Sequence, residues 1–233
     1  MKRLAKLQPL LGWATLLLLV AGGWLIANAP MDFQQGNSVR IIYLHVPSAK
    51  MSLLMYLAAT ACSVMYLWKK NESMDILAEA AVPVGALFTA VTLASGSIWG
   101  KPMWGTWWAW DARLTSMLVL LILYVGLMAL RSAIDNPVKS AQATAVMVLI
   151  GAVDLPIIHF SVQWWRTLHQ PASLGGGGTP RIEGALLTPL LVMAVAFIGL
   201  GGYLWALRTR TVAAQRQLDA LEHAEEDHDD AHP

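Results

Sequence analysis

Long runs of apolar residues restrict the fold of this chain more than any other feature of its sequence. The runs are roughly 20 residues long, which is the length that an α-helix needs to cross the ~30 Å hydrocarbon core of a bilayer. Only 13% of the 233 residues are charged, whereas soluble domains carry about a quarter. The sequence therefore predicts an all-α integral membrane protein, a bundle of six transmembrane helices joined by short loops.

The predicted spans account for most of the chain. They run approximately from Pro9 to Ala27, Ser48 to Trp68, Ala80 to Ile98, Leu114 to Leu130, Ala141 to His159 and Ala185 to Leu207. No connection between them has room for a soluble domain, so we assign residues 1–210 to one membrane domain. Residues 211–233 remain, and the segment Asp219–Pro233 holds seven of the fifteen acidic residues. Such a composition is typical of a solvated, disordered tail.

The basic residues are divided unevenly between the two sides of the predicted bundle. Ten lie on the side of the termini (Lys2, Arg3, Lys6, Lys69, Lys70, Arg131, Lys139, Arg208, Arg210 and Arg216), and six lie on the other side (Arg40, Lys50, Lys101, Arg113, Arg166 and Arg181). Cytoplasmic loops are enriched in Lys and Arg, so we expect both termini in the cytoplasm. The first apolar run also resembles a signal peptide that ends at Ala27-Asn28-Ala29. Its greater length and the Pro30 that follows favour a retained first helix.

Charge and cysteine content argue against several classes of function. The net charge of +1, with no basic surface interleaved with aromatic residues, gives no indication of nucleic-acid binding. Cys62 is the only cysteine, so the chain has neither an internal disulfide nor a cysteine-based metal site. The sequence also contains neither the Ser/His/Asp nor the paired-carboxylate pattern of a hydrolase.

Five tryptophans and one aspartate lie within Trp99–Asp111, on the second connection of the external side. Flat indole rings beside an acid and nearby cations suit a large, flat, partly charged aromatic ligand, and haem is the best candidate. An interfacial aromatic belt explains the single tryptophans near other helix ends, but it explains this cluster poorly. If the stretch is helical, positions 104, 107, 108 and 111 share one face. We expect a haem platform formed by Trp104, Trp107, Trp108, Trp110 and Asp111.

Two histidines lie on the same predicted side as the tryptophans. His45 ends the first external connection, and His169 lies in the third. Neutral imidazole is a common ligand of haem iron, so these two side chains could supply both axial ligands. A lone interfacial histidine more often bonds a backbone carbonyl, but the shared side of the membrane favours the ligand interpretation. His159 is a weaker candidate, beside Trp164 and Trp165.

Charged side chains on the external side complete the predicted site. Haem carries two propionates, which require cations or donors; the candidates are Arg113, Arg166, Arg181, Lys50 and Lys101. Ordinary contact with lipid headgroups explains each of these equally well when it is taken singly. We expect Asp111 to hold the platform rigid by accepting a hydrogen bond from Arg113 or an indole. Asp154, an acid within a span, is either functional or a residue that simply reaches water or caps freed backbone groups.

The combined motifs resemble a known family. Trp104-Gly-Thr-Trp-Trp-Ala-Trp-Asp111 resembles the tryptophan-rich signature of the haem-handling proteins of cytochrome c maturation. His45-Val-Pro-Ser-Ala, Leu-Pro-Ile-Ile-His159 and Trp164-Trp165-Arg-Thr-Leu-His169-Gln are similar to the flanking segments of the haem exporter protein C family, CcmC. The resemblance covers nearly all the chain.

The resemblance implies a function in the bacterial inner membrane. It implies that haem b is bound as cargo at the periplasmic face, with His45 and His169 as axial ligands. It also implies delivery to the membrane-anchored haem chaperone CcmE, within an ABC-type complex that contains CcmA, CcmB and the small protein CcmD. We therefore expect haem transfer (lyase-like at most) rather than conventional enzyme catalysis.

Two other functions are compatible with a haem-binding or solute-binding membrane bundle. A cytochrome b-like electron carrier usually holds haem between histidines within its spans, and here no histidine is expected at mid-span. A permease for haem or another solute requires polar residues along a path, and we expect spans that are almost entirely apolar apart from Asp154.

Overall fold

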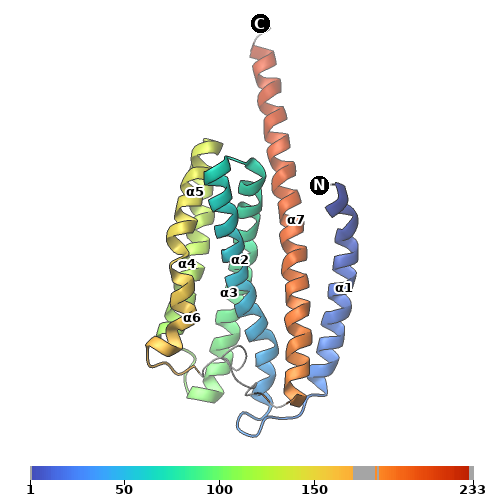
Figure 1. The fold of residues 1–233 in the computed structure, drawn as a ribbon, viewed down its shortest axis with the longest axis vertical. Coiled ribbons are helices and arrows are strands. Elements are labelled where there is room, and N and C mark those ends of the chain that lie inside the picture. The colour runs from blue at the N-terminus through green and yellow to red at the C-terminus, as the bar shows by residue number, and fades with distance from the viewer. Residues whose placement is uncertain (1, 170–181, 183, 231–233) are drawn as a thin grey trace.

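The computed structural model describes residues 2–169, 182 and 184–230 as a bundle of long helices that run roughly along one axis (Figure 1). The helices are α1 (Lys2–Ala27), α2 (Ile42–Lys69), α3 (Glu72–Trp104), α4 (Ala112–Ser132), α5 (Pro137–Gly151), α6 (Asp154–Trp164) and α7 (Gly184–Asp230), and the short 3₁₀-helix η1 (Asn37–Ile41) precedes α2. Six helical segments are long and apolar enough to cross a membrane, which confirms the predicted fold class.

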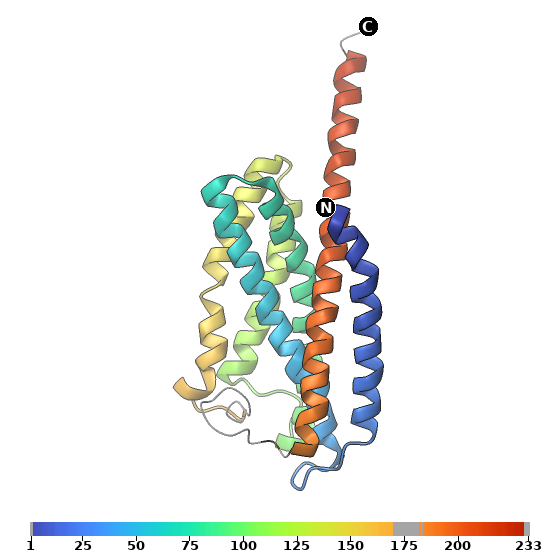
Figure 2. The same ribbon diagram turned by 45° about the vertical axis from the view of Figure 1, so that its right-hand side comes forward.

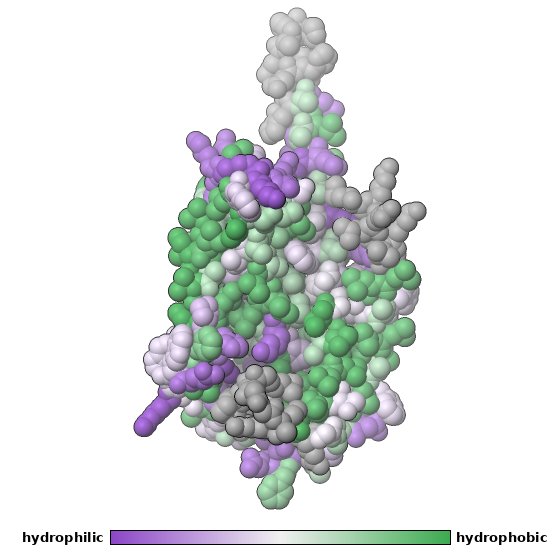
Figure 3. Space-filling model, in the orientation of Figure 1, coloured by the Kyte–Doolittle hydropathy of each residue, from purple (hydrophilic) through white to green (hydrophobic). Residues whose placement is uncertain are grey.

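The surface has the layered polarity of a membrane protein. Apolar side chains cover the middle of the bundle, and hydrophilic side chains gather towards its two ends (Figure 3). Many large apolar side chains point outward within the spans, including Leu17 and Ile122, which are 69% and 61% exposed. This exposure would be costly in water, but lipid tails are as apolar as the side chains themselves.

Local sequence signals determine where the helices begin and end. Asn71 and Asn136 precede α3 and α5, and each side chain accepts a hydrogen bond from a backbone N–H of the first turn, at 2.9 Å. These are N-caps, which satisfy N–H groups that have no partner within the helix. Lys70 ends α2 in the left-handed conformation, with φ of 50°. Short caps of this kind explain how long helices follow one another with few connecting residues.

The fifth span is not one continuous helix, as Ala141–His159 was predicted to be. It is divided into α5 and α6 by a break at Ala152 and Val153. Pro156 explains the break, because it has no N–H for a helical hydrogen bond and its ring displaces the preceding turn. Asp154 begins α6 and is only 9% exposed, and its Oδ2 has no partner among the described residues. It therefore lies inside the bundle instead of reaching water.

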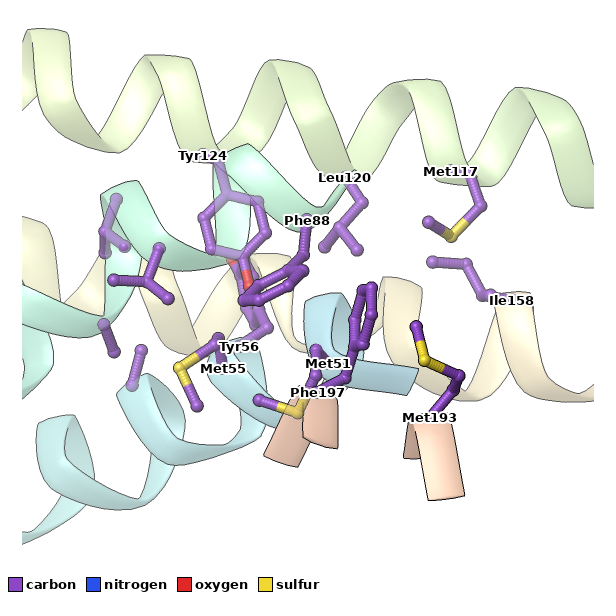
Figure 4. Close-up of a cluster of buried hydrophobic side chains, with 14 of the residues drawn as sticks. Met51, Met55, Tyr56, Phe88, Met117, Leu120, Tyr124, Ile158, Met193 and Phe197 are labelled. Carbon is purple, nitrogen blue, oxygen red and sulfur yellow. The ribbon is translucent and has the colours of Figure 1, made fainter. Parts of the chain in front are cut away.

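Helices α2 and α3 form the centre of the bundle, and α1 packs mainly against α7 (Figures 1 and 2). Aromatic side chains join the central helices to their neighbours, as Figure 4 shows. Tyr124 of α4 meets Tyr56 of α2 edge to face at 5.1 Å and donates a hydrogen bond to the Ser52 carbonyl at 2.7 Å. Gly85 makes this approach possible, because a Cβ atom there would lie 2.0 Å from the Tyr124 hydroxyl.

Small polar residues inside the spans are more numerous than we expected. Besides Asp154, the buried positions include Ser48, Ser52, Ser63, Thr89, Thr92, Ser95, Thr144 and Ser161. Most of these hydroxyls donate to a carbonyl of their own helix, as Thr89 does to Gly85 at 2.8 Å and Thr92 to Phe88 at 2.7 Å. Their polarity is satisfied locally, so burial is inexpensive.

An ion-pair network ties three helices together at the end of the bundle that carries the termini. Arg131 of α4 donates two hydrogen bonds to Asp75 of α3, at 2.8 and 2.6 Å. Arg216 of α7 reaches the same carboxylate at 2.6 Å, and both arginines also contact Glu79. The Asp75 side chain is only 6% exposed. Two arginines thus compensate a buried carboxylate that would otherwise be costly.

The C-terminal tail differs from the disordered segment that we predicted. Helix α7 continues without a break to Asp230, so most of residues 211–233 is helical. Its composition explains the difference, because Ala, Leu, Gln and Glu are strong helix formers. The helix projects beyond the other helices of the bundle (Figure 2).

The ion-pair network generates a stability prediction. Asp75→Asn removes the buried charge shared by both arginines, so we expect the free energy of unfolding to fall by about 3 kcal/mol. The control is Glu72→Gln, because the Glu72 side chain is 74% exposed and lies 3.5 Å from Arg216. Thermal unfolding in detergent would compare the two variants. Equal stability of both variants would contradict the structural role of Asp75.

Candidate functional site

Three segments that are far apart in the sequence meet at the end of the bundle opposite the termini (Figures 1 and 2). They are η1 with the start of α2, the connection from α3 to α4, and the end of α6 with the residues that follow it. His45 and His169 both belong to this end, and they lie near enough to interact electrostatically. The structure thus brings together the two histidines singled out by the sequence.

His45 lies in the first turn of α2, and not in the connection before it, because α2 begins at Ile42. Its Nδ1 is 3.1 Å from the Ser95 hydroxyl oxygen of α3. That hydroxyl donates its own proton to the Val91 carbonyl at 2.7 Å, so it accepts a hydrogen bond from Nδ1–H. The remaining ring nitrogen, Nε2, is then the one with a free lone pair.

Two further residues of α3 fix the position of the His45 ring. Trp99 meets it edge to face at 5.7 Å, and a Cβ atom on Gly96 would lie 2.9 Å from its Cε1. The Trp99 indole donates a hydrogen bond to Gln35 at 3.0 Å, which ties the connection before η1 to the same place. Sequence reasoning missed Ser95, Gly96 and Gln35 as site residues. The run of small residues Ser95-Gly96-Ser97 inside an apolar span was the available signal.

His169 is held by Asp111. Its Nδ1 lies 3.2 Å from Asp111 Oδ2, and the same oxygen accepts a hydrogen bond from the Leu168 N–H at 3.3 Å. The other oxygen, Oδ1, caps α4 by accepting from the Leu114 N–H at 2.8 Å. Asp111 thus acts as a rigid support, although its partners are not the Arg113 and indole donors that we expected. Trp104 packs edge to face on the imidazole at 4.9 Å.

Burial keeps the His169 imidazole neutral. It lowers the pKa of His169 below its ordinary value, and the hydrogen bond and charge of Asp111 oppose this effect only in part. A neutral imidazole that donates through Nδ1 presents the lone pair of Nε2. In this tautomer, either histidine would present Nε2 to iron or another metal.

The tryptophan stretch is not a continuous helix, so the predicted single face of positions 104, 107, 108 and 111 is wrong. Helix α3 ends at Trp104 because Gly105 adopts the left-handed conformation, with φ of 77°, and α4 starts only after the cap at Asp111. Trp107 and Trp110 are 57% and 78% exposed.

Trp108 is the inward-facing tryptophan of this loop. It meets Trp110 edge to face at 5.4 Å. The Thr106 hydroxyl donates to the Trp108 carbonyl at 2.9 Å, which holds the loop in its conformation. The indole N–H of Trp108 is buried and has no partner among the described residues. A buried donor without a partner is costly.

The predicted cations are not equivalent. Arg113 is partly buried, donates to the Ser161 hydroxyl at 3.2 Å and to the His159 carbonyl at 3.5 Å, and acts electrostatically on both site histidines. Lys101 instead donates to the Gly105 carbonyl at 3.1 Å. Lys50 and Arg166 are exposed, and Arg181 lies outside the described residues. Arg113 is therefore the cation that the structure brings closest to the histidines.

The lower-ranked residues form an exposed aromatic surface on α6. His159 contacts Phe160 edge to face at 4.7 Å, and Phe160 stacks on Trp164 at 5.2 Å. Trp165 meets Trp164 at 5.7 Å, and both tryptophans are at least half exposed. His159 itself is exposed. It thus differs from His45 and His169, whose Nδ1 atoms are both bonded to side chains.

Similar proteins identify the family of this chain. The model of the family described as Heme exporter protein C matches residues 1–224. The chain belongs to this family. It is 46% identical over 218 residues to Heme exporter protein C of Bradyrhizobium diazoefficiens, covering 94% of this chain and 83% of the relative. It is 45% identical over 209 residues to the protein of that name from Escherichia coli K12, covering 88% and 82%.

A more distant relative comes from a plant. A cytochrome c biosynthesis ccmC-like mitochondrial protein of Marchantia polymorpha is 43% identical over 205 residues, covering 88% of this chain and 87% of the relative. The matches to all three relatives include more than 80% of the length of both partners.

The contact between Gly96 and His45 generates a test of the site geometry. Gly96→Ala places a methyl group against the imidazole, and the strain should destabilise the protein by about 2 kcal/mol. The control is Gly23→Ala in α1, where a Cβ atom would meet nothing within 4 Å and where alanine favours the helix. Thermal unfolding in detergent measures both. An equally stable Gly96→Ala variant would contradict the close packing of the ring.

Proposed function

We propose that the protein binds haem at the external surface of the membrane and delivers it to a partner for cytochrome c maturation. The proposal rests on the similar hydrogen bonding of the two histidines. His45 and His169 lie at one end of the bundle, and each uses Nδ1 to bond a side chain and keeps Nε2 available. Two such imidazoles can bind haem iron from opposite sides.

The surrounding residues fit the rest of a haem molecule. Indole rings of Trp99 and Trp104 border the two histidines and offer an apolar aromatic surface to a porphyrin. The buried N–H of Trp108 and the guanidinium of Arg113 are donors suited to propionates. Because the chain carries haem as cargo, we expect the non-covalently bound form, haem b.

To deliver haem, this chain needs to hold the haem in the right orientation and does not need to catalyse a reaction itself. The two imidazoles and the indoles would hold haem with one edge directed outward, where an incoming protein can reach it. We infer that the recipient is the haem chaperone CcmE and that the chain works in an ABC-type complex with CcmA, CcmB and CcmD. The family description as a haem exporter supports this inference.

The proposed location is the bacterial inner membrane, with both termini in the cytoplasm and the histidine site at the periplasmic face. Both termini lie at the end of the bundle opposite the site (Figure 1), and that end carries the larger share of Lys and Arg. The exposed tryptophans at the site end, such as Trp110 and Trp164, suit the interface between lipid and water.

The rival functions receive less support. A cytochrome b-like carrier that moves electrons across the membrane needs haem sites at different depths, and both site histidines lie at one end. A permease needs polar groups that are free to contact a solute, and most buried hydroxyls bond carbonyls of their own helices, as those of Thr89 and Thr92 do.

The ligand assignment predicts a change in the visible spectrum. Purified wild-type protein loaded with haem should show six-coordinate, bis-histidine spectra. His45→Ala and His169→Ala should each lose this signature and bind haem at least about tenfold more weakly. His159→Ala is the matched control, because that ring is exposed, and it should retain the wild-type spectrum. Wild-type spectra in both site variants would exclude these histidines as ligands.

The membrane orientation predicts a labelling pattern. With Cys62 replaced by Ser, single cysteines at Phe33 and Trp110 should react with a membrane-impermeant maleimide added to the periplasmic side, because both side chains are exposed at the site end. A cysteine at Glu72 should react only after the membrane is opened. The reverse pattern would place the site in the cytoplasm.

A further inference from the structure

We propose that the two histidines are unequal ligands: Asp111 makes His169 the ligand that keeps the haem, and Ser95 leaves His45 as the ligand that dissociates first during delivery. This inference rests on the proposed function and adds an order of events to it. It follows from the different chemical nature of the two Nδ1 partners.

The partner of His45 is a neutral oxygen. Ser95 already donates its only proton to the Val91 carbonyl at 2.7 Å and lies 3.2 Å from the Thr92 carbonyl. Its oxygen can therefore accept from Nδ1–H, but it carries no negative charge. A hydrogen bond to a neutral acceptor draws little charge from the imidazole, so Nε2 remains an ordinary donor to iron.

The partner of His169 is a carboxylate. Asp111 is 8% exposed and accepts hydrogen bonds from two backbone N–H groups in addition to the imidazole. A carboxylate that accepts from Nδ1–H increases the basicity of the coordinating nitrogen, so His169 should form the stronger bond to iron.

Neighbouring residues hold both rings in place. His45 belongs to the start of α2, where Gly96 and Trp99 of α3 restrict its movement. His169 follows the end of α6, and Asp111 bonds both its ring and the neighbouring Leu168 N–H. The order of dissociation therefore rests on the strength of the two bonds to iron.

The proposed first step is simple in its chemistry. The bond between iron and His45 Nε2 breaks, and the electron pair returns to the nitrogen. No proton or electron is exchanged with another molecule. The iron keeps His169, and the vacated position becomes open to a ligand of the recipient protein.

Single-ligand variants test this inequality directly. His45→Ala leaves only His169 as an axial ligand, and His169→Ala leaves only His45. Both are loaded with haem, reduced, and measured by resonance Raman spectroscopy. We expect a higher iron–histidine stretching frequency in His45→Ala, because the carboxylate strengthens the bond. Equal frequencies, or the reverse order, would overturn the inference.

Substitution of the two positioning residues gives the second measurement. In the His45→Ala protein, Asp111→Asn should lower the stretching frequency and accelerate haem loss to apomyoglobin by about tenfold. In the His169→Ala protein, Ser95→Ala should cause a smaller shift and a smaller acceleration. Asparagine is as good an N-cap as aspartate, so Asp111→Asn preserves the start of α4 through Oδ1. Its –NH2 group replaces Oδ2, which removes both the charge and the acceptor for His169 and the Leu168 N–H.

The outcomes separate this inference from the proposed function. If the single-histidine variants bind haem but Asp111→Asn leaves the frequency unchanged, the inference is wrong and haem binding stands. If neither single-histidine variant nor the wild-type protein binds haem, the proposed function is wrong and the inference fails with it.

Discussion

The Asp111 carboxylate holds the site end of the molecule together. One oxygen begins α4 by capping the Leu114 N–H, and the other accepts from both Leu168 and His169. The two oxygens therefore serve two kinds of structure, one a helix terminus and the other a link between segments 58 residues apart. Because the group is almost fully buried, loss of its charge would leave several N–H groups without their acceptor.

The opposite end of the bundle uses the same principle, a buried carboxylate surrounded by donors. There the buried carboxylate of Asp75 is bound by the guanidinium groups of Arg131 and Arg216. Between these two polar ends the helices depend on close packing, such as that of Tyr124 against Gly85, because lipid provides no hydrophobic force between helices. The bundle is thus held together by hydrogen bonds and ion pairs at its ends and by close side-chain packing in its centre.

Particular residues show where prediction from the sequence succeeded. Six apolar runs gave six spans, because a run of about 20 apolar residues satisfies the bilayer by itself. Because successive spans cross the membrane in opposite directions, the sequence also placed His45 and His169 at the same end of the bundle. The prediction of one helical face of tryptophans was wrong, because Gly105 in the left-handed conformation ends α3 at Trp104. The prediction of a continuous fifth helix was wrong because the helix breaks between α5 and α6, before Pro156.

The sequence by itself determined the fold class, the number of spans and the identity of the two histidines. These properties depend on length, hydropathy and residue type, which are local. Only the tertiary structure decided that Ser95 bonds His45 and that Asp111 bonds His169, across separations of 50 and 58 residues. Such partners depend on how the helices are rotated and packed against one another, and no spacing along the chain encodes that rotation. The difference between a hydroxyl and a carboxylate partner, on which the proposed inequality of His45 and His169 rests, belongs to the packed molecule.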